Sequence, residues 1–201
     1  MALNKDAVYT AAKGYIFTAP IDTTAPTVAQ ITGFDSGTPA METFASDGIT
    51  PQTWDIVGHT ARDELPVFGY EGGDVETRGT WQAEVIKTVV TEPASDYVTF
   101  NVHQFDKSNM EFYYGQTSSD ADPNIYSVTE SGVTAVERAL LIVIVDGTYK
   151  LGFYAPSTEI RREDSIELAV DEFAYMPLRA TLTKSDVAPV LFSWINVGAS
   201  V

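Results

Sequence analysis

The side chains that could bind a metal or catalyse acid–base chemistry are few, and they are not grouped in the sequence. The chain has two histidines, His59 and His103, which lie far apart and lack the spacing typical of metal ligands. We expect each to be a surface or strand residue rather than a ligand, and we predict no metal site. Cysteine is absent, which excludes disulfides and thiolate metal sites.

Acidic residues occur in pairs, at Asp63-Glu64, Glu163-Asp164 and Asp171-Glu172. A glycoside hydrolase needs two positioned carboxylates, but a chain with 28 acidic residues contains such pairs by chance. The run Arg161-Arg162-Glu163-Asp164 fits a solvated turn or an inter-subunit salt-bridge site. The sequence therefore predicts no carboxylate pair that acts in catalysis.

The glycine-rich and nucleophile motifs of common enzymes are also absent. No nucleophile elbow, P-loop or dinucleotide fingerprint occurs, and Gly72-Gly73 lies between acids, which indicates a turn between strands. Trp54, Trp81 and Trp194 could stack on sugars or bases, but packing in the core or at a subunit interface is the default for tryptophan. We predict no catalytic residue, no cofactor and no enzymatic activity.

The charge balance restricts the partners. The 12 Lys and Arg stand against 28 Asp and Glu, giving a formal net charge of −16. Nucleic-acid binding depends on cations that neutralise phosphates, so this balance argues against a DNA or RNA binder, but not against a protein that DNA passes without sticking. No stretch resembles a signal peptide or a membrane helix, which predicts a soluble protein made in a cytoplasm.

The elements that must position these residues are mostly strands. We predict one domain, residues 1–201, forming an antiparallel β-sandwich or β-barrel with one short α-helix. The strands are expected at 14–19, 81–91, 97–103, 139–145, 149–154, 165–170, 178–183 and 190–195.

One helix signal stands out. Ser108 and Glu111 fit a capping box, and Gly115 stands where a C-terminal cap belongs. Residues 117–134 read as a polar loop. Asp146-Gly147 predicts a type I′ hairpin turn after the apolar run 139–145, and a hairpin this apolar needs cover to avoid aggregation.

A long segment at about 19–53 contains four prolines and many turn residues, so we predict an irregular excursion. Unstructured segments of this length are uncommon in compact domains and are usually functional.

Several segments, read in order, resemble the major tail proteins of long-tailed (siphovirus-type) actinobacteriophages, the subunits of the tail tube. The similar segments are residues 6–20, 24–27, 58–60, 62–66, 72–74, 79–81, 97–106, 113–115, 137–147 and 171–174, with Trp194. They cover nearly the whole chain.

The resemblance implies a β-sandwich whose subunits close into six-membered rings, with strands of neighbouring copies joined in one barrel. Stacked rings would form the tail tube through which DNA passes during ejection, without specific binding. On this resemblance, the 19–53 excursion is our candidate for the contact between successive rings. The implied partners are other copies of the chain, a tape measure protein and tail terminator or baseplate proteins. The implied location is the virion tail, after synthesis in the host bacterial cytoplasm.

Other functions fit parts of the sequence. A carbohydrate- or receptor-binding β-sandwich module of the virion would use Trp54, Trp81 or tyrosines as an exposed platform. A capsid decoration or tail-completion protein is a structural alternative. A glycoside hydrolase is the weakest alternative, because nothing in the sequence marks a cleft with two carboxylates.

Overall fold

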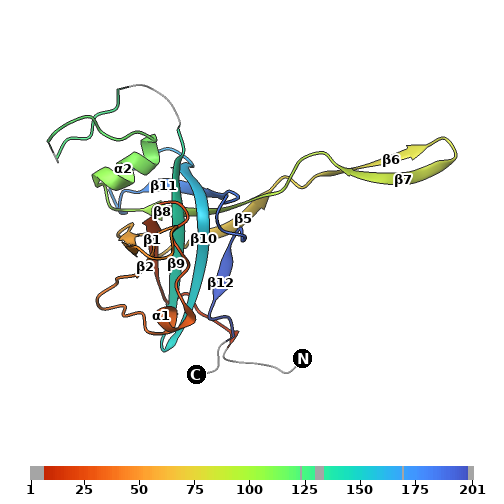
Figure 1. Ribbon diagram of the computed structural model, residues 1–201. Helices are drawn as coiled ribbons and strands as arrows, with labels where there is room; N and C mark the ends of the chain where they lie inside the picture. Colours follow the sequence, from red (N-terminus) through yellow and green to blue (C-terminus); the bar gives the residue numbers. More distant parts are fainter. Residues whose placement is uncertain (1–6, 123, 130–133, 169, 199–201) are drawn as a thin grey trace.

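The computed structural model describes residues 7–122, 124–129, 134–168 and 170–198, and within these ranges the chain is mainly β, as predicted (Figure 1). The elements are β1 (Lys13–Ala19), α1 (Val28–Thr32), β2 (Glu42–Phe44), β3 (Pro51–Thr53), β4 (Asp55–Ile56), β5 (Val67–Glu71), β6 (Val75–Thr80), β7 (Ala83–Val90), β8 (Ser95–Val102), α2 (Lys107–Tyr114), β9 (Val136–Asp146), β10 (Tyr149–Arg162), β11 (Met176–Leu182) and β12 (Ser193–Ile195).

The largest sheet is antiparallel and has the order β4-β1-β9-β10-β11-β8-β5, with β12 also paired to β10. Its long strand β10 changes register against β9 between Ala155 and Thr158, at Pro156, which has no amide hydrogen to donate. The part of β10 before this bulge pairs with β12, and the part after it pairs with β11. As a result β8 and β11 cross β1 and β9 in Figure 1, and the sheet encloses a core.

Strand β9 is apolar because both of its faces are buried. Leu140 and Ile142 belong to the core that includes β8, β11 and α2. Leu141 and Val143 point the other way, into a second core with Phe17 and Trp54. Successive strand residues face opposite sides, so a strand covered twice has no polar positions. This double cover removes the aggregation hazard inferred from the sequence.

The second core is closed by the 19–53 segment, which is more ordered than the prediction of an irregular excursion. Helix α1 begins with a capping box in which Thr27 and Gln30 bond reciprocally, and it buries Ile31. Strands β2 and β3 form a small separate hairpin. The prediction of a single helix was wrong, since the described residues contain two. The Thr27-x-x-Gln30 pattern was the signal that would have found α1.

Helix α2 lies where the sequence predicted a helix, but its cap differs. Asp106, not Ser108, is the N-cap residue, and its carboxylate accepts from the backbone N–H of Asn109 at 2.9 Å. At the other end Gly115 adopts the left-handed conformation, with φ 69°, as predicted. The helix packs Phe112 and Tyr113 into the first core.

Several strand predictions need correction. Residues 165–170 form no strand among those described (residue 169 lies outside them), and Glu167 makes only an isolated bridge to Tyr175. Of the strand predicted at 190–195, only the three residues of β12 form a strand. The 81–91 prediction becomes β7, with Trp81 in the turn before it. Residues 165–168 have no partner strand beyond the bridge from Glu167 to Tyr175, and β-propensity alone does not place a segment in a sheet.

The loop prediction is confirmed in the described part of the segment, whereas the predicted turn type is wrong. The 117–134 segment contains no helix or strand in its described part, and residues 123 and 130–133 lie outside that part. The hairpin after β9 turns through Gly147 and Thr148, and of these only Gly147 has positive φ. That is the pattern of a type II′ turn, so the predicted type I′ turn was wrong.

No helix in the described ranges is long and apolar enough to cross a membrane.

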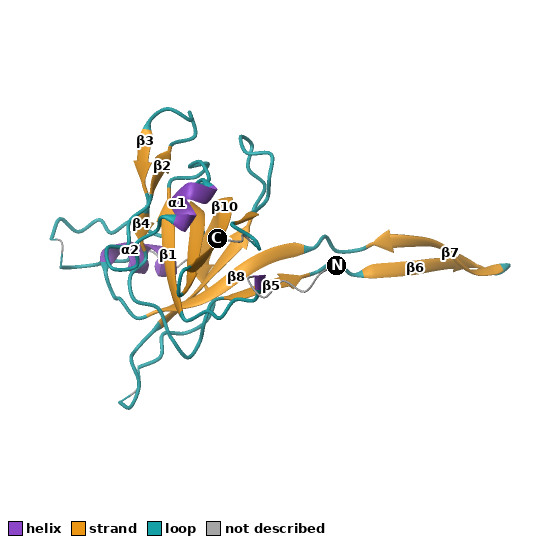
Figure 2. Cartoon of the chain, turned by 90° about the horizontal axis from the view of Figure 1, so that it is seen from below, coloured by secondary structure: helices purple, strands orange, loops and turns teal. Residues whose placement is uncertain are grey.

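Strands β6 and β7 form a two-stranded sheet of their own. Residues 75–90, called the arm here, project far from the rest of the molecule (Figures 1 and 2). Gly72 and Gly73, both with positive φ, make the predicted turn at the base of the arm. The base is closed by a 2.9 Å bond from the Thr91 N–H to the Asp74 carbonyl.

Candidate assembly surfaces

Members of two of the three carboxylate pairs, Glu163-Asp164 and Asp63-Glu64, make local structural contacts. Glu163 lies 3.6 Å from Arg179 in an ion pair, and Asp164 accepts a 2.7 Å bond from the backbone N–H of Ser165. Glu64 accepts a hydrogen bond from Asn101. Among the residues that the structure describes, no group of three or more His, Asp or Glu is placed to hold a metal ion.

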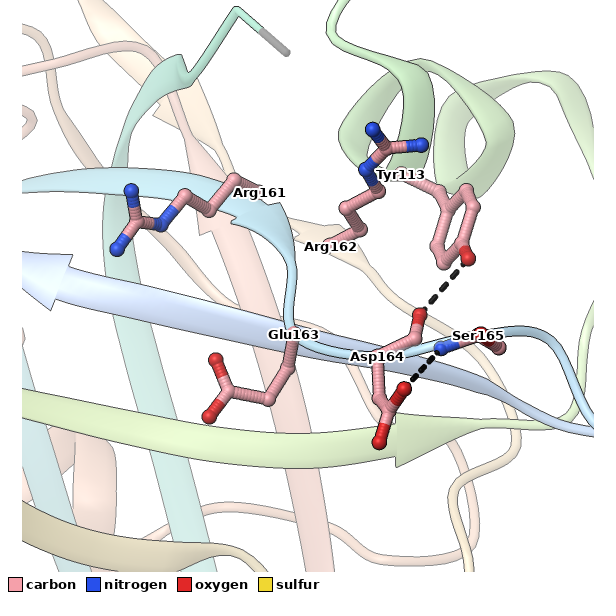
Figure 3. Close-up of a pocket in the computed structure, with 6 residues that line it drawn as sticks. All are labelled: Tyr113, Arg161, Arg162, Glu163, Asp164 and Ser165. Atoms are coloured by element: carbon pink, nitrogen blue, oxygen red, sulfur yellow. Dashed lines mark hydrogen bonds between the residues drawn. The ribbon is translucent and has the colours of Figure 1, made fainter.

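The Arg161-Arg162-Glu163-Asp164 run lies at the end of β10 and lines a hollow of about 400 Å³ beside α2 (Figure 3). The Tyr113 hydroxyl donates to the Asp164 carbonyl at 2.8 Å. Burial raises the pKa of Tyr113, and Tyr114 adds to this while Arg162 opposes it. Within the described part of the chain neither Arg161 nor Arg162 forms an ion pair, so both can pair with acids of another copy.

The two histidines, distant in sequence, are neighbours in space. The backbone N–H of His103 donates to the His59 carbonyl at 2.9 Å, because residues 59–61 run antiparallel to the end of β8. Nδ1 of His103 lies 3.0 Å from the Ala174 carbonyl, and its ring is 5.7 Å from that of Phe173. No sequence pattern indicated this proximity, which depends on strand pairing.

The histidines belong to a hollow with a volume of about 920 Å³ and mostly apolar walls. This hollow is called the histidine pocket here. It is lined by His59, Thr60, Arg62, Asp63, His103, Gln104 and Phe173. The Phe173 side chain is 82% exposed at its rim, so an apolar ring stands open to solvent.

The three tryptophans have three different environments. Trp54 is buried in the second core, where its Nε1 donates to the Thr43 hydroxyl at 2.9 Å. Trp194 on β12 is partly exposed and packs against Phe68 and Phe153. Trp81 is 100% exposed at the tip of the arm. Core packing was the correct expectation for Trp54, whereas Trp81 lies on the surface.

The arm exposes apolar side chains along its length. Every residue of β6 is exposed, as are most residues of β7. Val75, Val85, Ile86 and Val90 lie on the surface together with Trp81. A two-stranded hairpin alone is only marginally stable in water, and exposed apolar patches mark interaction sites. The arm is therefore a surface suited to contact with another protein.

Strand β5 is a second uncovered feature. It ends the large sheet, and in the described ranges it has a strand, β8, on one side only. Val67, Phe68 and Tyr70 are exposed on it. An apolar edge strand is a template for pairing with another chain unless something covers it.

The open edge of β5 and the exposed arm indicate a class of protein. An open apolar sheet edge and a long apolar arm are typical of a subunit of a larger protein assembly. The comparisons place the chain within that class. It belongs to the phage tail tube protein family, whose family model matches residues 1–200.

Two curated relatives agree with this assignment. The chain is 43% identical over 197 residues to the major tail protein Gp23 of Mycobacterium phage D29, and equally to the protein of that name from Mycobacterium phage L5. In each case the match covers 98% of this chain and 94% of the relative. The resemblance to phage major tail proteins inferred from the sequence is confirmed. The chain is a structural protein of the phage tail.

Proposed function

We propose that copies of this chain close into hexameric rings that stack into the tail tube and conduct phage DNA during ejection. The family match over the whole chain is the observation that carries the proposal, and the uncovered edge and arm support it. The partners are other copies of the chain, a tape measure protein, and tail terminator or baseplate proteins. DNA passes without specific binding, and the subunit has no enzymatic role and is made in the host cytoplasm.

Ring closure is supported by the open edge of β5. Pairing of β5 with a strand of the next copy would satisfy its backbone groups and cover Val67 and Tyr70. A head-to-tail contact of this kind closes into a ring when its rotation divides a full turn. Arg161 and Arg162, which carry two of the chain's few positive charges, are available to acids of a neighbouring copy.

The net charge of −16 suits a conduit for DNA. Acidic side chains facing the lumen would repel phosphates within a Debye length of about 8 Å at physiological salt. We expect an acidic inner wall in the assembled ring. A surface-potential map of a ring structure tests this, and a basic wall would contradict it.

The arm, rather than the 19–53 excursion, is our candidate for the contact between copies. Phe34, Met41 and Thr43 of the excursion are buried against the sandwich. Deleting residues 34–50 would therefore expose the second core, and we expect it to leave no folded subunit. The arm does not cover a core, since neither of the two hydrophobic cores contains an arm residue.

The arm can be removed cleanly because Asp74 and Thr91 already close its base. Replacing residues 75–90 with an Asn-Gly turn should give a folded protein whose melting temperature stays near that of the wild type. We expect wild-type protein at high concentration to form rings or tubes in negative-stain micrographs, and the armless variant to form no tubes. The control Ile49→Ser, at the exposed β2–β3 turn, should form normal tubes.

Two results would refute parts of this proposal. Armless protein that forms tubes of normal length would remove the arm from assembly. Wild-type protein that stays monomeric at high concentration, with or without other tail proteins, would refute self-assembly.

The exposed Trp81 also fits a carbohydrate-binding module of the virion. A glycan array in which binding depends on Trp81 would favour that function.

A further inference from the structure

We propose that the Trp81 indole at the tip of one arm enters the histidine pocket of a second copy of the chain. This inference rests on the proposed function, because it identifies the acceptor of the arm within the assembly. It joins a fully exposed aromatic side chain to an apolar hollow of about 920 Å³.

The donor side is the tip of the arm. Trp81 is fully exposed, and the arm that carries it points away from the sandwich (Figure 2). A tryptophan side chain buries up to about 250 Å² when it docks, and tryptophan is the residue most enriched at binding hot spots. Gly79 helps to shape the tip, because a side chain there would collide with the backbone of Glu84 at 2.1 Å.

The acceptor side is the histidine pocket. Its volume of about 920 Å³ lies within the range of small-molecule sites, and it exceeds what one indole occupies. The pocket can therefore hold Trp81 together with a flanking residue of the tip. The rings of His103 and Phe173 already meet edge to face, with an interplanar angle of 63°, and such a pair offers a third ring an aromatic wall.

Each of the two surfaces carries one cation and one anion beside the proposed contact, and Arg78 pairs with Glu76 of its own chain at 3.1 Å. Arg78 and Glu84 lie three residues before and after Trp81, and both are exposed. The pocket has Arg62 and Asp63 side by side in its lining. An indole seated between them can place Arg78 near Asp63 and Glu84 near Arg62. Paired rim charges of this kind select orientation more than they add affinity.

The absence of native cysteine allows a direct test by disulfide trapping. One protein carries Gln82→Cys beside the indole, and a second carries Thr60→Cys in the pocket lining. The two full-length proteins are mixed, assembled under reducing conditions and then oxidised. We expect a disulfide between positions 82 and 60 in assembled material, identified by mass spectrometry of the linked peptides. The control pair, Gln82→Cys with Ile49→Cys, should give at most a trace.

The outcomes separate this inference from the proposed function. Tubes that form without the 82–60 link, or with an equal 82–49 link, would overturn the pocket assignment and leave tube assembly standing. Wild-type protein that never forms rings or tubes would overturn the proposed function itself. If the cysteine variants do not assemble, tryptophan fluorescence emission provides the test of the pocket assignment. Assembly should shift wild-type emission to the blue, and Trp81→Phe should lose most of that shift, whereas an unchanged shift would refute the inference.

The strength of the contact gives an independent measurement. Trp81→Ala should raise the protein concentration needed for assembly by about 30-fold, the effect of losing one interface hot spot. Gln82→Ala, one residue away, should change it by less than about threefold. Similar effects of the two substitutions would contradict a specific role for the indole.

Discussion

The guanidinium of Arg179 lies 3.7 Å from the centre of the Tyr97 ring. The two residues belong to neighbouring strands, β11 and β8, and form a diagonal pair on one face. Arg179 is buried, and it also pairs with Glu71 at 2.5 Å and with Glu163 at 3.6 Å. One side chain therefore ties together β5, β8 and the end of β10.

Replacement of Arg179 by Ala should lower the free energy of unfolding by about 2 kcal/mol, from the lost cation–π contact and ion pairs. Arg179→Lys should lose roughly half of this, because an ammonium cannot reproduce the planar fork. The control Arg78→Ala breaks an exposed pair with Glu76 at 3.1 Å and should cost under about 0.5 kcal/mol. Urea denaturation measures all three, and equal losses for Arg78 and Arg179 would contradict this account.

Asp106 is the observed N-cap residue of α2, and Ser108 is the one predicted from the sequence. Asp106→Ala removes the bond to the Asn109 N–H and should destabilise the protein by about 1 kcal/mol. Ser108→Ala, which would matter if the sequence-predicted capping box existed, should be nearly neutral because Ser108 is exposed and makes no cap. Thermal unfolding of both variants decides. A larger loss for Ser108 would restore the original prediction.

Two glycines with nearly the same φ should differ in what they tolerate. At Gly115, with φ 69°, a Cβ atom would lie 1.8 Å from the Thr134 carbonyl oxygen. At Gly147, with φ 61°, it would meet nothing within 4 Å. Gly147→Ala should cost about 1 kcal/mol of backbone strain, whereas Gly115→Ala should cost about 3 kcal/mol or more. Comparable melting temperatures for the two variants would show that the loop at Thr134 yields readily.

Stability should fall in strong alkali through Tyr154. Burial, helped by the Asp22 carboxylate, raises the pKa of Tyr154 from 10.0 to about 12. Between these values the unfolded chain loses the proton while the folded protein keeps it, so stability decreases as pH rises, by about 2 kcal/mol from this residue. Below about pH 10 the contribution is fully present.

Tyr154→Phe isolates this effect. The variant loses the 2.7 Å hydrogen bond to the Thr23 carbonyl and should be about 1 kcal/mol less stable at pH 7. Its further loss between pH 10 and pH 12 should be smaller than that of the wild type. Denaturation curves at several alkaline pH values measure the difference, and parallel pH profiles would rule out a role for Tyr154.

Assembly should respond to salt. Copies with a net charge of −16 repel one another, and added salt screens that repulsion. We expect tubes to form at lower protein concentration as NaCl is raised from about 50 to 500 mM. Sedimentation at each salt concentration measures this, and tubes that dissolve on salt addition would instead show that ion pairs such as those open to Arg161 and Arg162 dominate.

Local patterns in the sequence predicted much of the framework. Strands 14–19, 97–103 and 139–145, the helix ending at Gly115 and the turn at Gly72-Gly73 all lie close to their predicted places. These features depend on alternation, caps and glycine conformation, which act over a few residues. The strand prediction at 165–170 was wrong, because local propensity cannot tell whether a partner strand is present.

The sequence alone determined the family, the mainly β class and the acidic character of this protein. Only the tertiary structure decided that His59 and His103 share a pocket, that the 19–53 segment covers a core, and that Trp81 stands free at the tip of an arm. The reason is physical. Composition and periodicity fix what each segment can do, but which face becomes buried depends on distant strands that meet only in the folded chain.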